Sequence, residues 1–87
     1  DILTNVVEYI FTLNKDKLIA ISKSNWKPRQ RIILTSDPKN LTRAYEFLKD
    51  TIYVETNLSA KDIMIYSNKL LDEFNVDKNT ISIFIPE

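Results

Sequence analysis

The sequence predicts a small α+β fold, in which two amphipathic helices pack on a mixed sheet in the approximate order β-β-β-α-β-α-β. Three observations lead to this prediction. Several short apolar runs are rich in β-branched and aromatic residues, which is typical of strands. Two longer segments repeat apolar residues at the spacing of a helix. Turn-forming and helix-capping residues separate these segments, so strands and helices follow one another along the chain.

Three strands are expected before the first helix. The segment 2–13 fits both a helical and an alternating apolar period, and its β-branched and aromatic content favours a strand from about residue 6. Asn14 to Asp16 are typical of a tight turn, after which the segment 18–23 would pair with the first strand as a hairpin. A polar break containing Pro28 then precedes a third strand at about residues 30–35.

The first helix is expected to begin at Asp37. Aspartate is a suitable N-cap, and Pro38 stands at the first helical position, where its missing N–H is not needed. The apolar stripe of this helix would comprise Leu41, Ala44, Tyr45, Leu48 and Ile52. We expect the helix to stop near Asp50, because the composition of residues 51–56 favours a short fourth strand.

The second helix has the clearest boundary in the sequence. Ser59 is a suitable N-cap, Asp62 stands at the capping-box position, and Leu58 and Ile63 occupy the two positions of a hydrophobic staple. The apolar face of this helix comprises Ile63, Tyr66, Leu70, Leu71 and Phe74. Asn75 fits its C-terminus, and the alternating residues 81–85 predict a last strand.

Length and composition predict one globular domain over residues 1–87. The chain is long enough for one hydrophobic core and too short for two, and its 44% hydrophobic and 28% charged residues are typical of folded proteins. The chain begins at Asp1 and not at methionine, which suggests that the domain was excised from a larger protein. Glycine is absent, so we expect asparagines at positions that need a positive φ.

The sequence also favours an intracellular location, in the cytoplasm or nucleus. Cysteine is absent, and no apolar run approaches the roughly 20 residues that a membrane-spanning helix needs. The N-terminus lacks the basic and small-residue features of a signal peptide. We therefore expect no membrane partner.

The residue types that are missing exclude most familiar catalytic sites. Without histidine or cysteine, the chain has no common general base, no thiol nucleophile and none of the usual zinc ligands. Without glycine, it has neither a P-loop nor a dinucleotide-binding fingerprint. We expect no enzymatic activity, no cofactor and no metal site.

The carboxylates allow one catalytic alternative. The predicted order of elements resembles the core of the ribonuclease-H-like fold, which implies acids on the first strand, on the first helix and at the end of the fourth strand. Glu8, Glu46 and Glu55 stand at those places. The opposing interpretation is that they are ordinary acids of a helix face and of strand ends, and no motif favours catalysis. We therefore predict no catalytic residue.

Basic and acidic residues are unevenly distributed, although the net charge is zero. Residues 15–43 carry a charge of +6, whereas residues 1–14 carry −2 and residues 44–87 carry −4. The basic residues of the middle segment are Lys15, Lys17, Lys23, Lys27, Arg29, Arg31, Lys39 and Arg43. Because charge governs which partners a protein attracts, this asymmetry points to binding.

We therefore expect a non-catalytic protein-protein interaction module of a larger intracellular protein. An acidic surface or peptide of the partner would contact a basic inter-strand loop, where arginine can form bidentate contacts, or would add to a sheet edge. The predicted contact residues are Lys23, Trp26, Lys27, Arg29, Arg31 and Arg43.

Two alternatives stay open for the basic segment. In the first, residues 15–43 bind nucleic acid and an exposed Trp26 stacks on a base. In the second, Trp26 folds back over the sheet and the basic residues only solvate an exposed loop.

Overall fold

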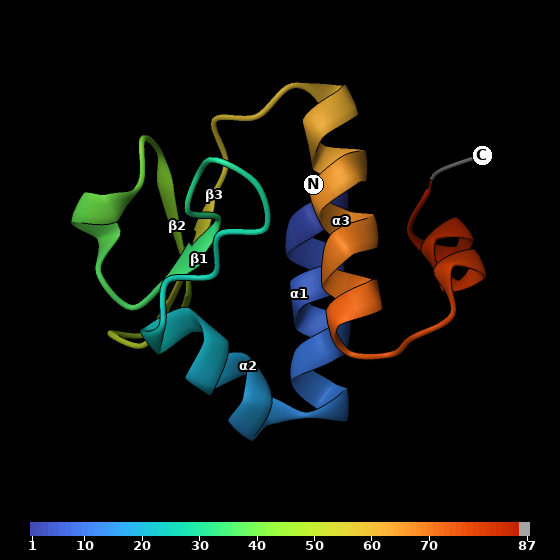
Figure 1. The fold of residues 1–87 in the computed structure, drawn as a ribbon, viewed down its shortest axis with the longest axis horizontal. Helices are drawn as coiled ribbons and strands as arrows, with labels where there is room; N and C mark the ends of the chain where they lie inside the picture. The colour runs from blue at the N-terminus through green and yellow to red at the C-terminus, as the bar shows by residue number, and fades with distance from the viewer. Residues whose placement is uncertain (86–87) are drawn as a thin grey trace.

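Three α-helices, two 3₁₀ segments and one antiparallel sheet form the part of the chain that the computed structural model describes, residues 1–85. The elements in chain order are α1 (Ile2–Leu13), α2 (Lys15–Lys23), β1 (Leu34–Thr35), η1 (Pro38–Asn40), β2 (Ala44–Leu48), β3 (Ile52–Glu55), α3 (Ala60–Glu73) and η2 (Lys78–Phe84). Figure 1 shows their arrangement. The α+β class is confirmed, and the predicted order of elements is not.

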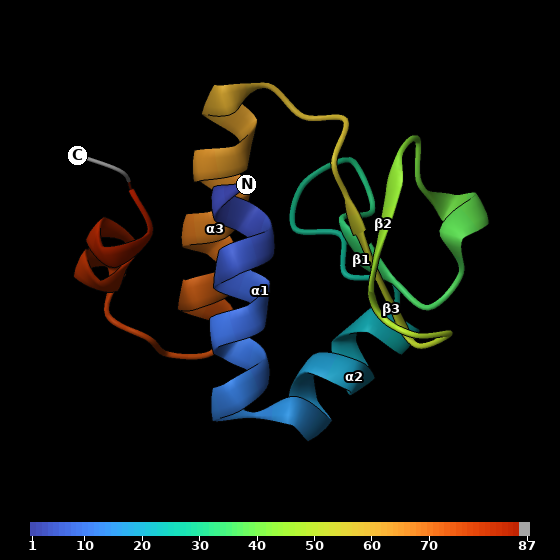
Figure 2. The ribbon, with the colours of Figure 1, turned by 180° about the vertical axis from the view of Figure 1, so that it is seen from behind.

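The helices α1 and α3 lie side by side and run in the same general direction, between the sheet and η2 (Figures 1 and 2). α2 crosses the end of this pair and contacts β1 and β3. The sheet has the strand order β1-β3-β2, and all its pairs are antiparallel, so the expected mixed sheet is wrong. No helix within residues 1–85 is long and apolar enough to cross a membrane.

The predicted hairpin of the first 23 residues is wrong, because both segments are helices. Asp1 caps α1 by accepting from the amide of Thr4 at 2.9 Å. The side chains of α1 that face the core are all fully buried at helical spacing: Leu3, Val6, Val7 and Ile10. Burial of this stripe against α3 outweighs the β propensity of valine and isoleucine. Asn14 then caps α2 through the amide of Lys17.

The predicted first helix is also wrong. Asp37 caps a helical start and Pro38 occupies its first position, as expected, but the turn ends after three residues as η1. Leu41 returns to extended backbone, and residues 44–48 pair with β3 as strand β2. The amides of Thr42 and Arg43 donate to the carboxylate of Glu55, which holds this segment beside β3 and prevents the helix from continuing.

The remaining predictions are mixed. The strand β3 and the helix α3 lie where they were expected, and Ser59 caps α3 by accepting from the amide of Asp62 at 3.1 Å. The third predicted strand is reduced to the two residues of β1. Asn25 and Asn75 take positive φ, as the lack of glycine predicts, and Asp50 does so in the β2–β3 turn.

The predicted last strand is a 3₁₀ segment, η2. Its N-cap is Asp77, which accepts from the amide of Asn79 at 2.8 Å. Ile81 and Phe84, three residues apart, pack against the core, and Phe84 makes an edge contact with Tyr9 of α1. Residues three apart lie on the same side of a 3₁₀ helix. Contact of Ile81 and Phe84 with the outer side of the helix pair therefore favours a 3₁₀ conformation over a strand.

A buried serine in α3 gives a testable prediction. Ser67 is fully buried, and its Oγ makes no hydrogen bond to any residue that the structure describes. A buried hydroxyl without a partner costs about 1–3 kcal/mol of desolvation, and alanine has the higher helix propensity. We therefore expect Ser67→Ala to raise the free energy of unfolding by about 1 kcal/mol in urea denaturation.

Ser22→Ala is the matched control for this prediction. Ser22 is also buried in a helix, but its Oγ donates to the carbonyl of Leu18 at 2.9 Å. We expect no gain from this variant, because it loses a hydrogen bond. An equal gain in both variants would show that helix propensity alone, and not the unpaired hydroxyl of Ser67, sets the difference.

Candidate functional site

Trp26 lies in the core. Its side chain is 8% exposed, and its backbone forms an antiparallel bridge with Leu34 of β1. The indole Nε1 donates to Glu73 Oε1 at 3.3 Å, which connects the chain after α2 to the end of α3. Trp26 is therefore buried, as the second alternative expects, and its ring is not free to stack on a base.

The basic loop that follows α2 lies along α3, which carries acidic residues. Lys27 lines an open hollow together with Glu73. Arg29 and Arg31 line a second hollow together with Asp62. The basic and acidic segments of the sequence thus face each other in the folded chain, and part of the charge asymmetry is compensated there. This loop joins a helix to a strand, which corrects the expected inter-strand position.

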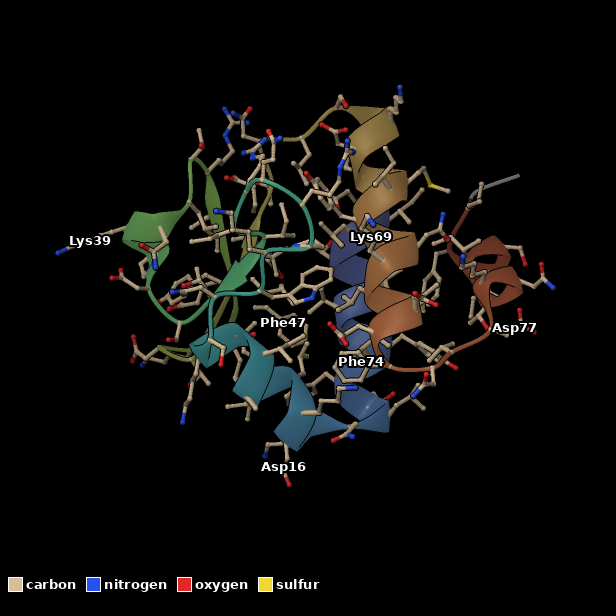
Figure 3. The ribbon with its side chains drawn as sticks, in the orientation of Figure 1. Asp16, Lys39, Phe47, Lys69, Phe74 and Asp77 are labelled. Atoms are coloured by element: carbon tan, nitrogen blue, oxygen red, sulfur yellow. The ribbon has the colours of Figure 1, made fainter. Side chains whose placement is uncertain are left out.

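Other basic residues of the segment 15–43 have different surroundings. Lys17 lies over the ring of Phe74, with 4.7 Å from Nζ to the ring centroid, and donates to the carbonyl of Glu73 at 2.6 Å. Lys17 thus holds α2 against the end of α3. In contrast, Lys39 points away from the molecule at the η1 turn, far from Phe74 (Figure 3).

Glu55 organises the end of the sheet. Its side chain is 2% exposed, and Oε1 forms an ion pair with Arg31 at 2.9 Å. The same carboxylate accepts from four backbone amides, those of Thr42, Arg43, Thr56 and Asn57, at 2.8 to 3.1 Å. One buried charge therefore joins the loop before β1, the start of β2 and the start of the link to α3.

These contacts determine the ionisation of Glu55. Burial acts to raise the pKa of this carboxyl. The amides of Thr42, Arg43 and Asn57, together with the charge of Arg31, outweigh burial and hold the pKa below its ordinary value of 4.5. Glu55 is therefore a structural carboxylate with its oxygens occupied by donors.

The structure divides the predicted contact residues into two groups. Lys23, Trp26 and Lys27 lie where α2 meets the following loop. Arg29, Arg31 and Arg43 lie around the link between β3 and α3. All of the six except Trp26 and the half-buried Arg31 are exposed.

Strand β2 forms an open edge of the sheet. Within residues 1–85 it pairs only with β3, and its residue Tyr45 is 49% exposed although its register partner Val54 is fully buried. Phe47 is half-buried and makes an edge contact with Phe11 of α1, with 5.4 Å between the ring centroids. Because the sequence predicts a helix at Tyr45, this surface is not predicted from the sequence; it exists only because residues 44–48 form a strand.

The three acids of the catalytic alternative are not brought together. Glu8 lies on α1, Glu46 on β2, and Glu55 is buried among donors. Glu46 accepts from the hydroxyl of Tyr53 at 2.8 Å, and this bond lowers the pKa of Glu46. The observed order of elements also differs from that of the ribonuclease-H-like core, so the resemblance is wrong.

Comparisons with known proteins add no relative. No protein-family model, no curated protein and no solved structure matches the chain.

Proposed function

We propose that this chain is a non-catalytic module that binds another protein, and that an extended segment of the partner adds to the sheet along β2. The observation that carries the proposal is the open edge of this five-residue strand. Unpaired backbone groups at a sheet edge are a ready template for another strand. The opposite edge is less suitable, because β1 has two residues and Trp26 already bridges it.

The direction of the backbone groups on β2 follows from one hydrogen bond. The carbonyl of Arg43 accepts from the amide of Thr56, so residue 43 faces β3. In an antiparallel pair, successive residues alternate between facing the partner strand and facing away from it. The N–H and C=O groups of Ala44 and Glu46 therefore point outward, where an added strand would meet them.

The side chains around β2 define the partner segment. Tyr45 and Phe47 offer an aromatic surface on the side of the sheet that faces the helices. An added strand would place every second side chain beside them, so apolar residues at alternate positions are favoured. Arg43 and Lys49 flank β2, are both exposed, and form no ion pair within residues 1–85. Acidic residues near the ends of the partner segment would match them.

Ala44→Pro tests the proposal. At an outward-facing position of an edge strand, proline leaves the existing pairing intact and removes the N–H that a partner would use. The probes are decapeptides selected from a random displayed library against the wild-type domain. In isothermal titration, we expect these peptides to bind Ala44→Pro at least tenfold more weakly than the wild type. Tyr45→Ser, which leaves the backbone N–H groups in place, is expected to weaken binding of the same peptides.

Ile83→Ser provides the control for loss of exposed apolar surface, because Ile83 is 67% exposed on η2. We expect peptide affinity to be unchanged in this variant. Peptides that bind Ala44→Pro and Tyr45→Ser as tightly as the wild type would place the binding surface away from β2. Circular dichroism melting of each variant separates lost binding from lost folding.

The nucleic-acid alternative has less support. Its stacking residue, Trp26, is buried, and Arg31 is paired with Glu55. Nucleic acid could then bind only through electrostatic contacts with residues such as Lys23 and Arg43, and the affinity for nucleic acid would fall steeply with salt. Titration with labelled single- and double-stranded oligonucleotides at low and moderate salt tests this second candidate directly.

A further inference from the structure

A hollow of about 290 Å³ lies between the basic loop and the first half of α3. It is lined by Arg29, Gln30, Arg31, Asp62 and Tyr66. Both arginines are among the contact residues predicted from the sequence, and Tyr66 is predicted there to lie on the apolar face of the second helix. The hollow is separate from β2 and shares no residue with it.

Tyr66 presents an unused donor to this hollow. The residue is 4% exposed, so its ring belongs to the core. Its hydroxyl forms no hydrogen bond among residues 1–85 and is not a fully enclosed polar atom, so it reaches solvent, and Tyr66 lines the hollow. A buried tyrosine usually finds a partner for its O–H, and here a ligand can supply it.

The arginines add further donors. Arg29 is exposed and forms no ion pair within the described residues. Arg31 uses one nitrogen on Glu55 and another on the carbonyl of Asn57. A guanidinium has five N–H groups, so Arg31 keeps donors beyond these two bonds. Gln30 contributes an amide with two more.

We propose that this hollow binds a single carboxylate of a polypeptide, held by the guanidinium groups of Arg29 and Arg31 and by the hydroxyl of Tyr66. Arginine and carboxylate suit each other geometrically, because two parallel N–H···O bonds can form. Asp62 lines the same hollow and Glu55 already balances Arg31, so the positive field is weak. Such a site favours a monoanion over a dianionic phosphate, whose second charge Asp62 repels.

Three probes distinguish the source of the carboxylate. The first is acetyl-Ala-Glu-Ala-amide, with a side-chain carboxylate; the second is acetyl-Ala-Gln-Ala with a free C-terminus; the third is inorganic phosphate. Binding is followed by NMR through the Nε–H resonances of the arginines. We expect at least one peptide to shift the Arg29 and Arg31 signals with millimolar affinity and to bind more tightly than phosphate.

Variants test the named donors. Tyr66→Phe keeps the ring in the core. It is expected to weaken peptide binding about tenfold, because the loss of one hydrogen bond to a charged group lowers affinity by about that factor. Arg29→Gln is expected to weaken it similarly. Asp62→Asn is expected to strengthen binding of phosphate more than that of the peptide, because it removes the repelling charge.

Two matched controls make the proposal falsifiable. Tyr53→Phe removes a hydroxyl that bonds Glu46 outside the hollow, and Lys39→Gln removes an exposed charge on η1. Both should bind the peptide as the wild type does. The proposal is overturned if Tyr66→Phe binds normally, if Lys39→Gln weakens binding as much as Arg29→Gln, or if phosphate binds more tightly than both peptides. None of these outcomes would affect the proposed role of β2.

Discussion

Replacing Trp26 with alanine is expected to lower the free energy of unfolding by about 3–5 kcal/mol, the usual cost of deleting a large aromatic side chain from a core. The indole is 8% exposed and belongs to the core cluster that includes Leu34 and Leu70. A domain of this size is stabilised by roughly 4–13 kcal/mol, so the variant would lose a large part of its stability. Urea denaturation followed by circular dichroism is the suitable measurement, because the variant lacks the lone tryptophan.

Two further variants separate packing from hydrogen bonding. Trp26→Phe keeps most of the aromatic volume and loses the bond to Glu73, so we expect a smaller loss, about 1–2 kcal/mol. Tyr45→Ala removes an aromatic that is 49% exposed and should cost less than about 1 kcal/mol. A cost for Trp26→Ala as small as that for Tyr45→Ala would contradict the core position of Trp26.

Replacing Glu55 with glutamine is expected to cost about 3 kcal/mol at neutral pH. Glutamine has the shape of glutamate, but its NH₂ group would face amide donors where the carboxylate accepts, and Arg31 would lose its partner. Removing one member of a buried ion pair is costly, because the groups left behind remain desolvated. Glu8→Gln, on the exposed side of α1, is the matched control and should change stability by less than about 0.5 kcal/mol.

The contribution of Glu55 should also depend on pH. The pKa of Glu55 in the folded chain is below its ordinary value of 4.5, so the folded state favours the ionised form. This contribution is therefore complete above pH 4.5 and is lost as the pH falls through the lower, folded-state value. The difference in unfolding free energy between wild type and Glu55→Gln should be constant near neutral pH and should shrink in acid. A difference that does not change with pH would contradict the charged state of Glu55.

Local signals in the sequence predicted several features correctly. Ser59 and Asp62 form the start of α3 through a bond between neighbours in the chain, so no distant residue is needed to specify it. Asp37 and Pro38 likewise begin a helical turn, although that turn stops after three residues. Asn25 and Asn75 take the positive φ that the absence of glycine requires. Each of these features depends on interactions within a few residues.

The candidate site was predicted only in part. The basic residues were identified from charge, and the structure gathers Arg29, Arg31 and Arg43 around one end of the sheet. Glu55 of β3 neutralises Arg31, and Asp62 of α3 lines the hollow beside Arg29 and Arg31; both acids lie more than twenty residues away from these arginines in the sequence, so charge counting overestimated the free positive surface. The open edge at Tyr45 was missed, because it exists only when β2 pairs with β3.

Local sequence signals correctly predicted the α+β class, the helix α3 with its cap, the strand β3, and the positive φ of Asn25 and Asn75, although not that of Asp50. Tertiary contacts decided the conformation of two segments, residues 2–13 and 44–48. Residues 2–13 fit two periods equally well, and burial against α3 selects the helix. Residues 44–48 have a helical apolar stripe, and hydrogen bonds from Thr42 and Arg43 to Glu55, with pairing to β3, select the strand. The physical reason is the same in both cases: intrinsic preferences differ by less than about 1 kcal/mol per residue, whereas burial and long-range hydrogen bonds contribute more.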